Sequence, residues 1–147
     1  MPTLCKQERL FEERLLSMLF DKGKRFTCSD FSRSDKQEEE DRASLRVCYL
    51  WVPRSEVWPQ DVSGTYSCKL LVNAPKSRYK HAVDRNRIKR LLREAFRFHK
   101  DLFAGLAPDG KVLLLSLQFA GGKFSLDRMR RLVEKTAGML QSRLPHA

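Results

Sequence analysis

The densest concentration of chemically active side chains is a basic run from Lys76 to Arg97. Nine lysines and arginines stand here against only Asp84 and Glu94, a net charge of +7 within 22 residues, while the whole chain of 147 residues carries +11. The cations are Lys76, Arg78, Lys80, Arg85, Arg87, Lys89, Arg90, Arg93 and Arg97. Guanidinium groups pair with phosphate oxygens through two hydrogen bonds and also stack on bases. The run therefore predicts a surface that binds nucleic acid.

Four of these cations, Arg85, Lys89, Arg93 and Arg97, follow one another at intervals of four residues. On a helix, like charges at this spacing repel one another by roughly a few tenths of a kcal/mol per pair. A helix face that is merely solvated usually alternates acidic and basic residues, and this plain solvated face is the alternative interpretation. Binding of phosphates explains the unbroken row of charge better. Charge alone does not distinguish RNA from DNA, although single strands and loops are reached more easily than the deep groove of duplex RNA.

A helix must position these cations, and we expect it to run from near Ala82 to about Leu102, since Gly105 and Pro108 follow. At about 100° per residue its side chains divide into two arcs. The arc expected to face the core holds Ile88, Leu91, Leu92, Ala95, Phe96, Phe98 and Leu102. The opposite arc holds Asn86, Arg87, Lys89, Arg90, Arg93, Glu94 and Arg97. One helix can thus serve both as core and as binding surface.

The remaining apolar patterns predict a mixed α/β sandwich, an α+β fold in which helices cover a sheet. An N-terminal helix ends near Lys22, before Gly23, and a last helix is capped by Ser125. The expected strands are Leu45–Val52, Thr65–Val72 and Val112–Phe119, with a short strand or extended segment at Phe26–Phe31. The connection between the first two of these strands suits a wide hairpin, and the third is apolar enough to be central or buried on both faces.

We expect one domain spanning residues 1–147, with a flexible acidic loop at 32–44. The cysteines Cys5, Cys28, Cys48 and Cys68 are too far apart in sequence to suggest zinc binding. No apolar run approaches a membrane span, and the N-terminus lacks the apolar region of a signal peptide. A soluble cytoplasmic protein with reduced thiols and no membrane partner is expected.

The basic run resembles the RNR motif of the bacterial ribonuclease P protein component. The resemblance rests on Lys76, Ala82, the hexapeptide Arg85-Asn86-Arg87-Ile88-Lys89-Arg90, then Arg93-Glu94 and Arg97. It implies a central, mainly antiparallel sheet packed with helices in the order α-β-β-β-α-β-α. It also implies a left-handed β-α-β crossover, in a fold like domain 2 of ribosomal protein S5.

In that family the RNA subunit performs the hydrolysis with Mg²⁺, and the protein assists the endonucleolytic removal of the 5′ leader from precursor tRNA. The resemblance therefore implies an accessory protein without catalytic or metal-binding residues, whose partners are the catalytic RNA and precursor tRNA, with no obligate protein partner. Mg²⁺ would be bound mainly by the RNA.

Carried onto this chain, the resemblance assigns RNA contacts to Lys76, Arg85, Asn86, Arg87, Lys89, Arg90, Arg93 and Arg97, and the charge of the basic run adds Arg78 and Lys80 to the predicted RNA-binding residues. Phe20 and Tyr49 would line a cleft for the precursor-tRNA leader, between the sheet and the N-terminal helix. Asn86 could instead cap the helix start, and the two aromatic residues could simply be core. Leu16 replaces an aromatic residue that is frequent in the family, and the acidic loop looks longer than usual. We expect that loop to point away from the cleft.

Two other functions fit the sequence less well. An autonomous nuclease would need converging carboxylates, and the only dense acidic cluster, Glu38–Asp41, lies in the expected flexible loop. A general RNA- or DNA-binding module of ribosomal type, with no role in tRNA processing, would also explain the basic helix. The Arg85-Asn86-Arg87 match within its wider spacing favours the ribonuclease P family.

Overall fold

The computed structural model describes residues 9–10, 12–29, 43–57, 68–108, 110–121 and 123–143. Within them the chain forms α1 (Glu13–Lys22), β1 (Lys24–Ser29), β2 (Ser44–Pro53), α2 (Arg54–Val57), β3 (Cys68–Asn73), α3 (Ala82–Phe98), α4 (Lys100–Ala104), β4 (Lys111–Gly121) and α5 (Leu126–Gln141). Apart from the short helices α2 and α4, this is the predicted order of elements. The expected acidic loop lies almost wholly outside the described residues, and its last residue, Ser44, already belongs to β2.

The four strands form one sheet in the order β1-β2-β4-β3. The β1–β2 and β2–β4 pairs are antiparallel, and β3 pairs with β4 in parallel. The sheet is therefore mainly antiparallel, as predicted, and β4 is central. The predicted hairpin between β2 and β3 is wrong, because β4 lies between them. The apolar run of β4 can pair on both edges, and this long-range pairing overrides the nearness of β2 and β3 in sequence. The β3-α3-β4 segment is the expected β-α-β unit, and its left-handed sense stays a prediction.

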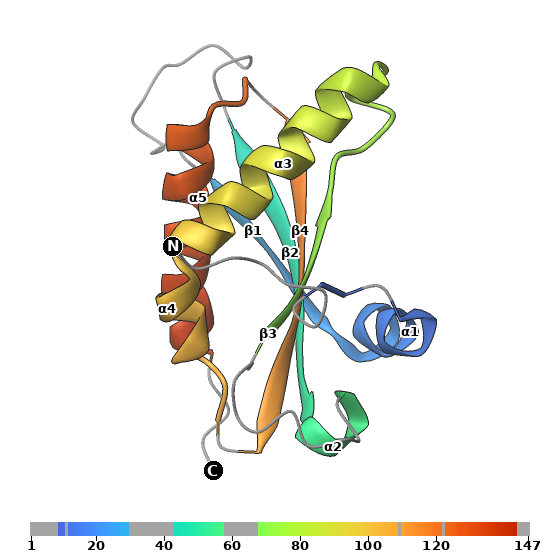
Figure 1. The fold of residues 1–147 in the computed structure, drawn as a ribbon, viewed down its shortest axis with the longest axis vertical. Coiled ribbons are helices and arrows are strands. Elements are labelled where there is room, and N and C mark those ends of the chain that lie inside the picture. Colours follow the sequence, from blue (N-terminus) through green and yellow to red (C-terminus); the bar gives the residue numbers. More distant parts are fainter. Residues whose placement is uncertain are drawn as a thin grey trace.

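Helices cover both faces of the sheet (Figure 1). Helices α3, α4 and α5 lie on one side, and α1 and α2 lie on the other. Because strand side chains alternate between faces, Leu113, Leu115 and Leu117 of β4 join the core under α3 and α5. Val112 and Leu114 join a second core under α1 with Leu15 and Leu19. This explains why β4 is almost continuously apolar.

Helix α3 ends earlier than predicted, at Phe98. His99 leaves helical geometry with φ −102° and ψ 19°, and α4 begins in a new direction at Lys100. The change of direction buries Phe103 completely and leaves Leu102 48% exposed. Phe98 is 62% exposed, and the Arg130 guanidinium lies 4.3 Å from the centroid of its ring. Assigning Phe98 and Leu102 to the core was wrong. Leu102 lies beyond the break, where the predicted helical phase no longer holds, and Phe98 is the last residue of α3, where its ring lies against Arg130 instead of entering the core.

Helix α5 begins as predicted, with the Ser125 hydroxyl oxygen accepting a 3.3 Å hydrogen bond from the backbone N–H of Arg128. At the edge of the sheet formed by β3, a backbone hydrogen bond of 2.8 Å joins the N–H of Leu10 to the carbonyl oxygen of Leu70. Beside it, the buried Lys69 ammonium lies 2.6 Å from a carboxylate oxygen of Glu12. Among the described residues, no helix is long and apolar enough to cross a membrane.

Candidate nucleic-acid interface

The outer face of α3 carries a hollow of about 510 Å³ whose polar lining is entirely cationic or neutral. It is lined by Val83, Asn86, Arg87, Lys89, Arg90 and Arg93. Five of the predicted RNA-binding residues therefore converge on one concave surface. Ile88 and Leu92, on the other side of the helix, are fully buried, so the hydrophobic core fixes the orientation in which these cations face outward.

Arg85 does not join this hollow. Its Nη1 donates hydrogen bonds of 2.8 Å to the carbonyl oxygen of Tyr79 and 2.9 Å to that of Lys80. The guanidinium therefore folds back and holds the segment before α3. The sequence pattern could not reveal this arrangement, because it depends on the path of the chain before the helix.

Two other members of the predicted row of like charge, Arg93 and Arg97, differ in their surroundings. The Arg97 guanidinium lies 2.6 Å from a carboxylate oxygen of Glu94, an (i, i+3) ion pair. Arg93 is half-buried, and this burial, followed by the charge of Arg9, lowers its pKa from the ordinary value. Glu94 thus offsets the charge of Arg97 at the C-terminal end of the row, whereas burial and the charge of Arg9 disfavour the charged form of Arg93, which lines the hollow.

The segment before α3 exposes the remaining predicted cations, Lys76, Arg78 and Lys80. Tyr79 anchors this segment, since its ring lies 6.0 Å from that of Phe119 in a stacked arrangement and 6.0 Å from that of Phe124 at a steep angle. Burial raises the pKa of Tyr79, while the charge of Arg78 opposes that shift. The segment is therefore fixed at one aromatic residue, with cations exposed on both sides of it.

Asn86 is not the residue that caps α3. The helix begins at Ala82 with His81 in the capping position, so Asn86 lies a full turn inside the helix, where its exposed side chain lines the hollow. The capping interpretation of Asn86 was wrong. Its position leaves the amide available to a ligand.

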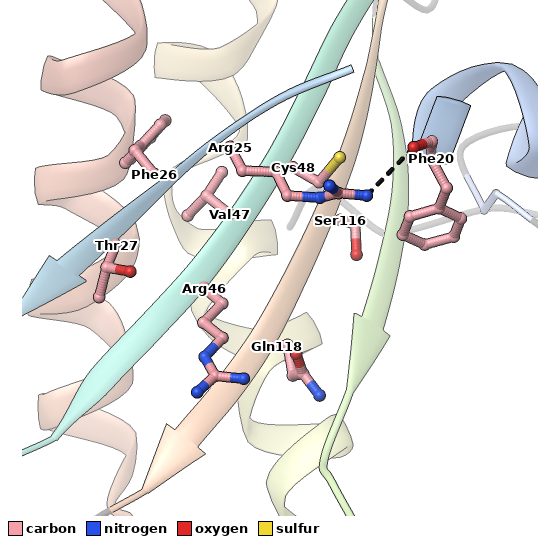
Figure 2. Close-up of a pocket in the computed structure, with 9 residues that line it drawn as sticks. All are labelled: Phe20, Arg25, Phe26, Thr27, Arg46, Val47, Cys48, Ser116 and Gln118. Carbon is pink, nitrogen blue, oxygen red and sulfur yellow. Dashed lines mark hydrogen bonds between the residues drawn. The ribbon is translucent and has the colours of Figure 1, made fainter. Parts of the chain in front are cut away.

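A second concave site lies on the opposite face of the sheet, next to the end of α1 (Figure 2). This cleft has a volume of about 430 Å³ and is lined by Phe20, Arg25, Phe26, Thr27, Arg46, Val47, Cys48, Ser116 and Gln118. The Phe20 side chain is 43% exposed. Nη2 of Arg25 donates a 3.1 Å hydrogen bond to the Phe20 carbonyl oxygen and ties β1 to the end of α1. An exposed aromatic ring thus borders a groove that contains two arginines.

Cys48 is a buried residue that lines this cleft. Its thiol donates to the carbonyl oxygen of Leu19 at a distance of 3.5 Å. Burial raises the pKa of Cys48, and the nearby Arg25 partly offsets the shift through its charge and a hydrogen bond. The group therefore stays a neutral thiol at physiological pH and is not an activated nucleophile.

Tyr49 does not line the cleft with Phe20. It is 3% exposed and belongs to the core under α3 and α5, where its ring lies 5.6 Å from that of Phe26 and 5.3 Å from that of Trp51. The assignment of Tyr49 to a cleft shared with Phe20 was wrong, because neighbouring strand residues point to opposite faces and it is Cys48 that faces Phe20.

The same alternation would have identified the cleft residues that sequence reasoning missed. Arg46 and Cys48 alternate with Leu45, Val47 and Tyr49 along β2, and Ser116 and Gln118 are the uncharged polar residues of β4. These positions share a face across the sheet, since Arg46 pairs with Gln118 and Cys48 pairs with Ser116. No group of three histidine, cysteine or acidic side chains converges within the described part of the chain.

Comparisons with known proteins bear on the family and the fold of the chain. The model of the ribonuclease P family matches residues 4–141. Ribonuclease P protein components from two strains of Porphyromonas gingivalis are 34% and 32% identical over 109 residues, which is 74% of this chain and 64% of each relative. The chain thus spans less than two thirds of the length of these curated relatives. The structure of the Staphylococcus aureus RNase P protein at 2.0 Å superposes with a TM-score of 0.53 at 17% identity, covering 90% of this chain and 94% of that one, and supports the fold.

Proposed function

The chain belongs to the ribonuclease P protein family, and we propose that it is the protein subunit that binds the catalytic RNA and the 5′ leader of precursor tRNA. The observation that carries this proposal is the cationic hollow on α3, where Arg87, Lys89, Arg90 and Arg93 converge. Arginine-rich concave surfaces suit phosphates, because guanidinium groups bind them through paired hydrogen bonds. The hollow and the exposed cations Lys76, Arg78 and Lys80 would bind the catalytic RNA.

The cleft beside Phe20 would bind the leader as a single strand. Single-stranded nucleic acid is bound by exposed aromatic rings that stack on bases and by cations that follow the backbone. Phe20 supplies such a ring, and Arg25 and Arg46 supply the cations. Gln118 and Ser116 place hydrogen-bonding groups on the floor of the cleft. The cleft thereby combines the groups that a short unpaired RNA strand requires.

The two surfaces lie on opposite sides of the sheet. Helix α3 covers one face, and the cleft opens beside α1 on the other (Figure 1). Catalytic RNA and leader can therefore occupy the protein simultaneously without competing for side chains. This arrangement supports an accessory role in which the protein brings substrate and catalyst together.

The proposal assigns hydrolysis, and the Mg²⁺ that it requires, to the RNA subunit. Cleavage of a phosphodiester by protein side chains would need a positioned base or carboxylates that hold metal ions, and the residues of both surfaces are cationic, neutral or aromatic. The proposal places the protein in the bacterial cytoplasm as part of a ribonucleoprotein.

A binding competition separates this function from that of a general nucleic-acid-binding module. Fluorescence anisotropy would follow binding of the protein to labelled ribonuclease P RNA, with a ribosomal RNA fragment and a DNA duplex of equal phosphate content as competitors. We expect the ribonuclease P RNA to bind at least about a hundredfold more tightly at moderate salt. Equal competition by all three nucleic acids would favour the general module.

A further inference from the structure

A third concave site, separate from the two surfaces above, lies where α1 meets β1. It has a volume of about 280 Å³, and its lining includes the cations Lys22, Lys24, Lys111 and Arg143 beside Tyr49 and Trp51. The four cations come from four different parts of the chain: the end of α1, the start of β1, the start of β4 and the residues after α5. We name this site the Trp51 hollow.

The local fold brings these cations together. Gly23 lets the chain pass so close to β2 that a Cβ atom there would lie 3.1 Å from the Tyr49 carbonyl oxygen. The close approach carries Lys22 and Lys24 to the end of the β1–β2 ladder, which stops in the described chain at the Lys24–Tyr49 pair. A cation at the end of α1 is ordinary by itself, because it complements the helix dipole. The convergence of cations from three further segments is not explained in this way.

The polar and aromatic groups of the hollow are held in place. Arg143 donates from Nη1 to the Tyr49 hydroxyl at 3.3 Å and lies 4.8 Å over the Phe26 ring. The Trp51 indole N–H donates to the carbonyl oxygen of Leu106 at 3.1 Å, which fixes the orientation of its partly exposed ring. A fixed aromatic surface beside four cations has the two components of a single-stranded nucleic-acid site, namely a stacking ring and partners for phosphate.

The Trp51 hollow is distant from the candidate catalytic-RNA surface. Strand β4 begins at Lys111 in the hollow and ends at Gly121, where a Cβ atom would lie 3.3 Å from Nη1 of Arg78. Ten residues of strand separate these points, a span of about 33 Å. The hollow also differs from the leader cleft, because Lys24 lines the hollow while its neighbour Arg25 lines the cleft.

We propose that the Trp51 hollow binds one nucleotide of single-stranded RNA, with the base against Trp51 and the phosphate among Lys22, Lys24, Lys111 and Arg143. The inference deepens the proposed function, on which it rests for the choice of RNA as ligand. It adds a third contact at the opposite end of the sheet from Arg78. An RNA strand that leaves the cleft around the β1 edge, or a loop of the catalytic RNA, would supply the nucleotide.

Tryptophan emission tests this proposal directly, because the chain has only two tryptophans, Trp51 and Trp58. In a full-length Trp58→Phe protein all tryptophan emission comes from Trp51, and octauridylate is the probe. We expect octauridylate to change this emission. The double substitution Lys22→Glu and Lys111→Glu should raise the octauridylate concentration that gives half of the emission change about tenfold or more, since it reverses two charges at the phosphate position.

The matched control is Arg131→Glu with Lys135→Glu, which changes the net charge equally on the exposed side of α5. It should shift the midpoint by less than about twofold, the effect of net charge alone at distant, screened positions. The Arg87→Ala, Arg90→Ala protein should retain the emission change. The proposal is overturned by unchanged emission when anisotropy shows octauridylate bound, or by equal shifts in test and control proteins. Either result leaves the proposed function standing if the protein still binds ribonuclease P RNA.

Discussion

The guanidinium of Arg85 donates a 2.8 Å hydrogen bond to the carbonyl oxygen of Tyr79, six residues earlier in the chain. Arg85 occupies the first position of the Arg-Asn-Arg sequence, yet its side chain points back toward the segment that carries Lys76, Arg78 and Lys80. In this structure it is therefore a positioning residue, whereas Arg87, two residues later, faces the hollow on α3.

This difference predicts distinct effects of two neighbouring substitutions. Arg85→Ala should weaken binding of ribonuclease P RNA about fivefold to tenfold, because the segment before α3 loses two hydrogen bonds that fix its cations, while the salt dependence of binding stays nearly unchanged. Arg87→Ala should reduce the slope of log Kd against log salt by about 0.7, the value for one lost phosphate contact. Titrations at several salt concentrations measure both. An equal loss of slope in the two proteins would show that Arg85 contacts phosphate itself.

The RNA affinity of the unmodified protein should depend steeply on salt. If six cations each neutralise one phosphate, affinity should fall roughly 10²- to 10³-fold between about 50 and 200 mM salt.

Replacing Arg87 and Arg90 together with Ala should flatten this salt dependence and leave the fold intact, because both side chains are exposed. Circular dichroism serves as the folding control. An unfolded double variant would contradict the assignment of these residues to the surface.

The position of Phe20 predicts a selective effect on substrate binding. Phe20→Ala should weaken the binding of precursor tRNA to the reconstituted holoenzyme by about tenfold, since stacking of one base on an aromatic ring contributes about 1–3 kcal/mol. Phe20→Tyr keeps the ring and should restore the affinity. Binding of mature tRNA, which has no leader, is the control. A similar loss for mature tRNA would place the effect of Phe20 outside the leader cleft.

Cys48 predicts a pH dependence of stability. Burial raises its pKa in the folded state above the ordinary value of 9.0, so the unfolded chain loses the thiol proton at lower pH than the folded protein does. Stability from this group is complete below pH 9 and is lost as pH rises through the folded pKa. Urea unfolding of wild type and Cys48→Ala from pH 7 to 10.5 isolates this contribution. The unfolding free energy of the wild type, relative to that of Cys48→Ala, should fall only above about pH 9. A difference that stays constant with pH would contradict the raised pKa.

Much of the fold follows from local patterns in the sequence. The spacing of Leu15 and Leu19, the Ser125 cap and the apolar run of β4 each depend on nearby residues, and the corresponding elements lie where they were predicted. The order of the strands depends on long-range pairing, which no local pattern encodes, and the expected β2–β3 hairpin was therefore wrong.

The candidate sites divide in the same way. The cations of α3 could be predicted because helical periodicity places them opposite Ile88 and Leu92. The role of Arg85 could not be predicted without knowing the path of the preceding segment. The position of Tyr49 could not be predicted without knowing which face of β2 meets α5. The Trp51 hollow is assembled from residues as far apart as Lys22 and Arg143, so only the folded chain brings it together.

Cleavage of precursor tRNA at a Mg²⁺ concentration too low for the catalytic RNA alone tests the central claim most directly. The measured quantity is the single-turnover rate of leader removal by a bacterial ribonuclease P RNA, with and without this protein. The account predicts a large acceleration by the protein, reduced in the Arg87→Ala, Arg90→Ala variant, and no cleavage by the protein without the RNA. An unchanged rate with folded protein, or cleavage without the RNA, would contradict it.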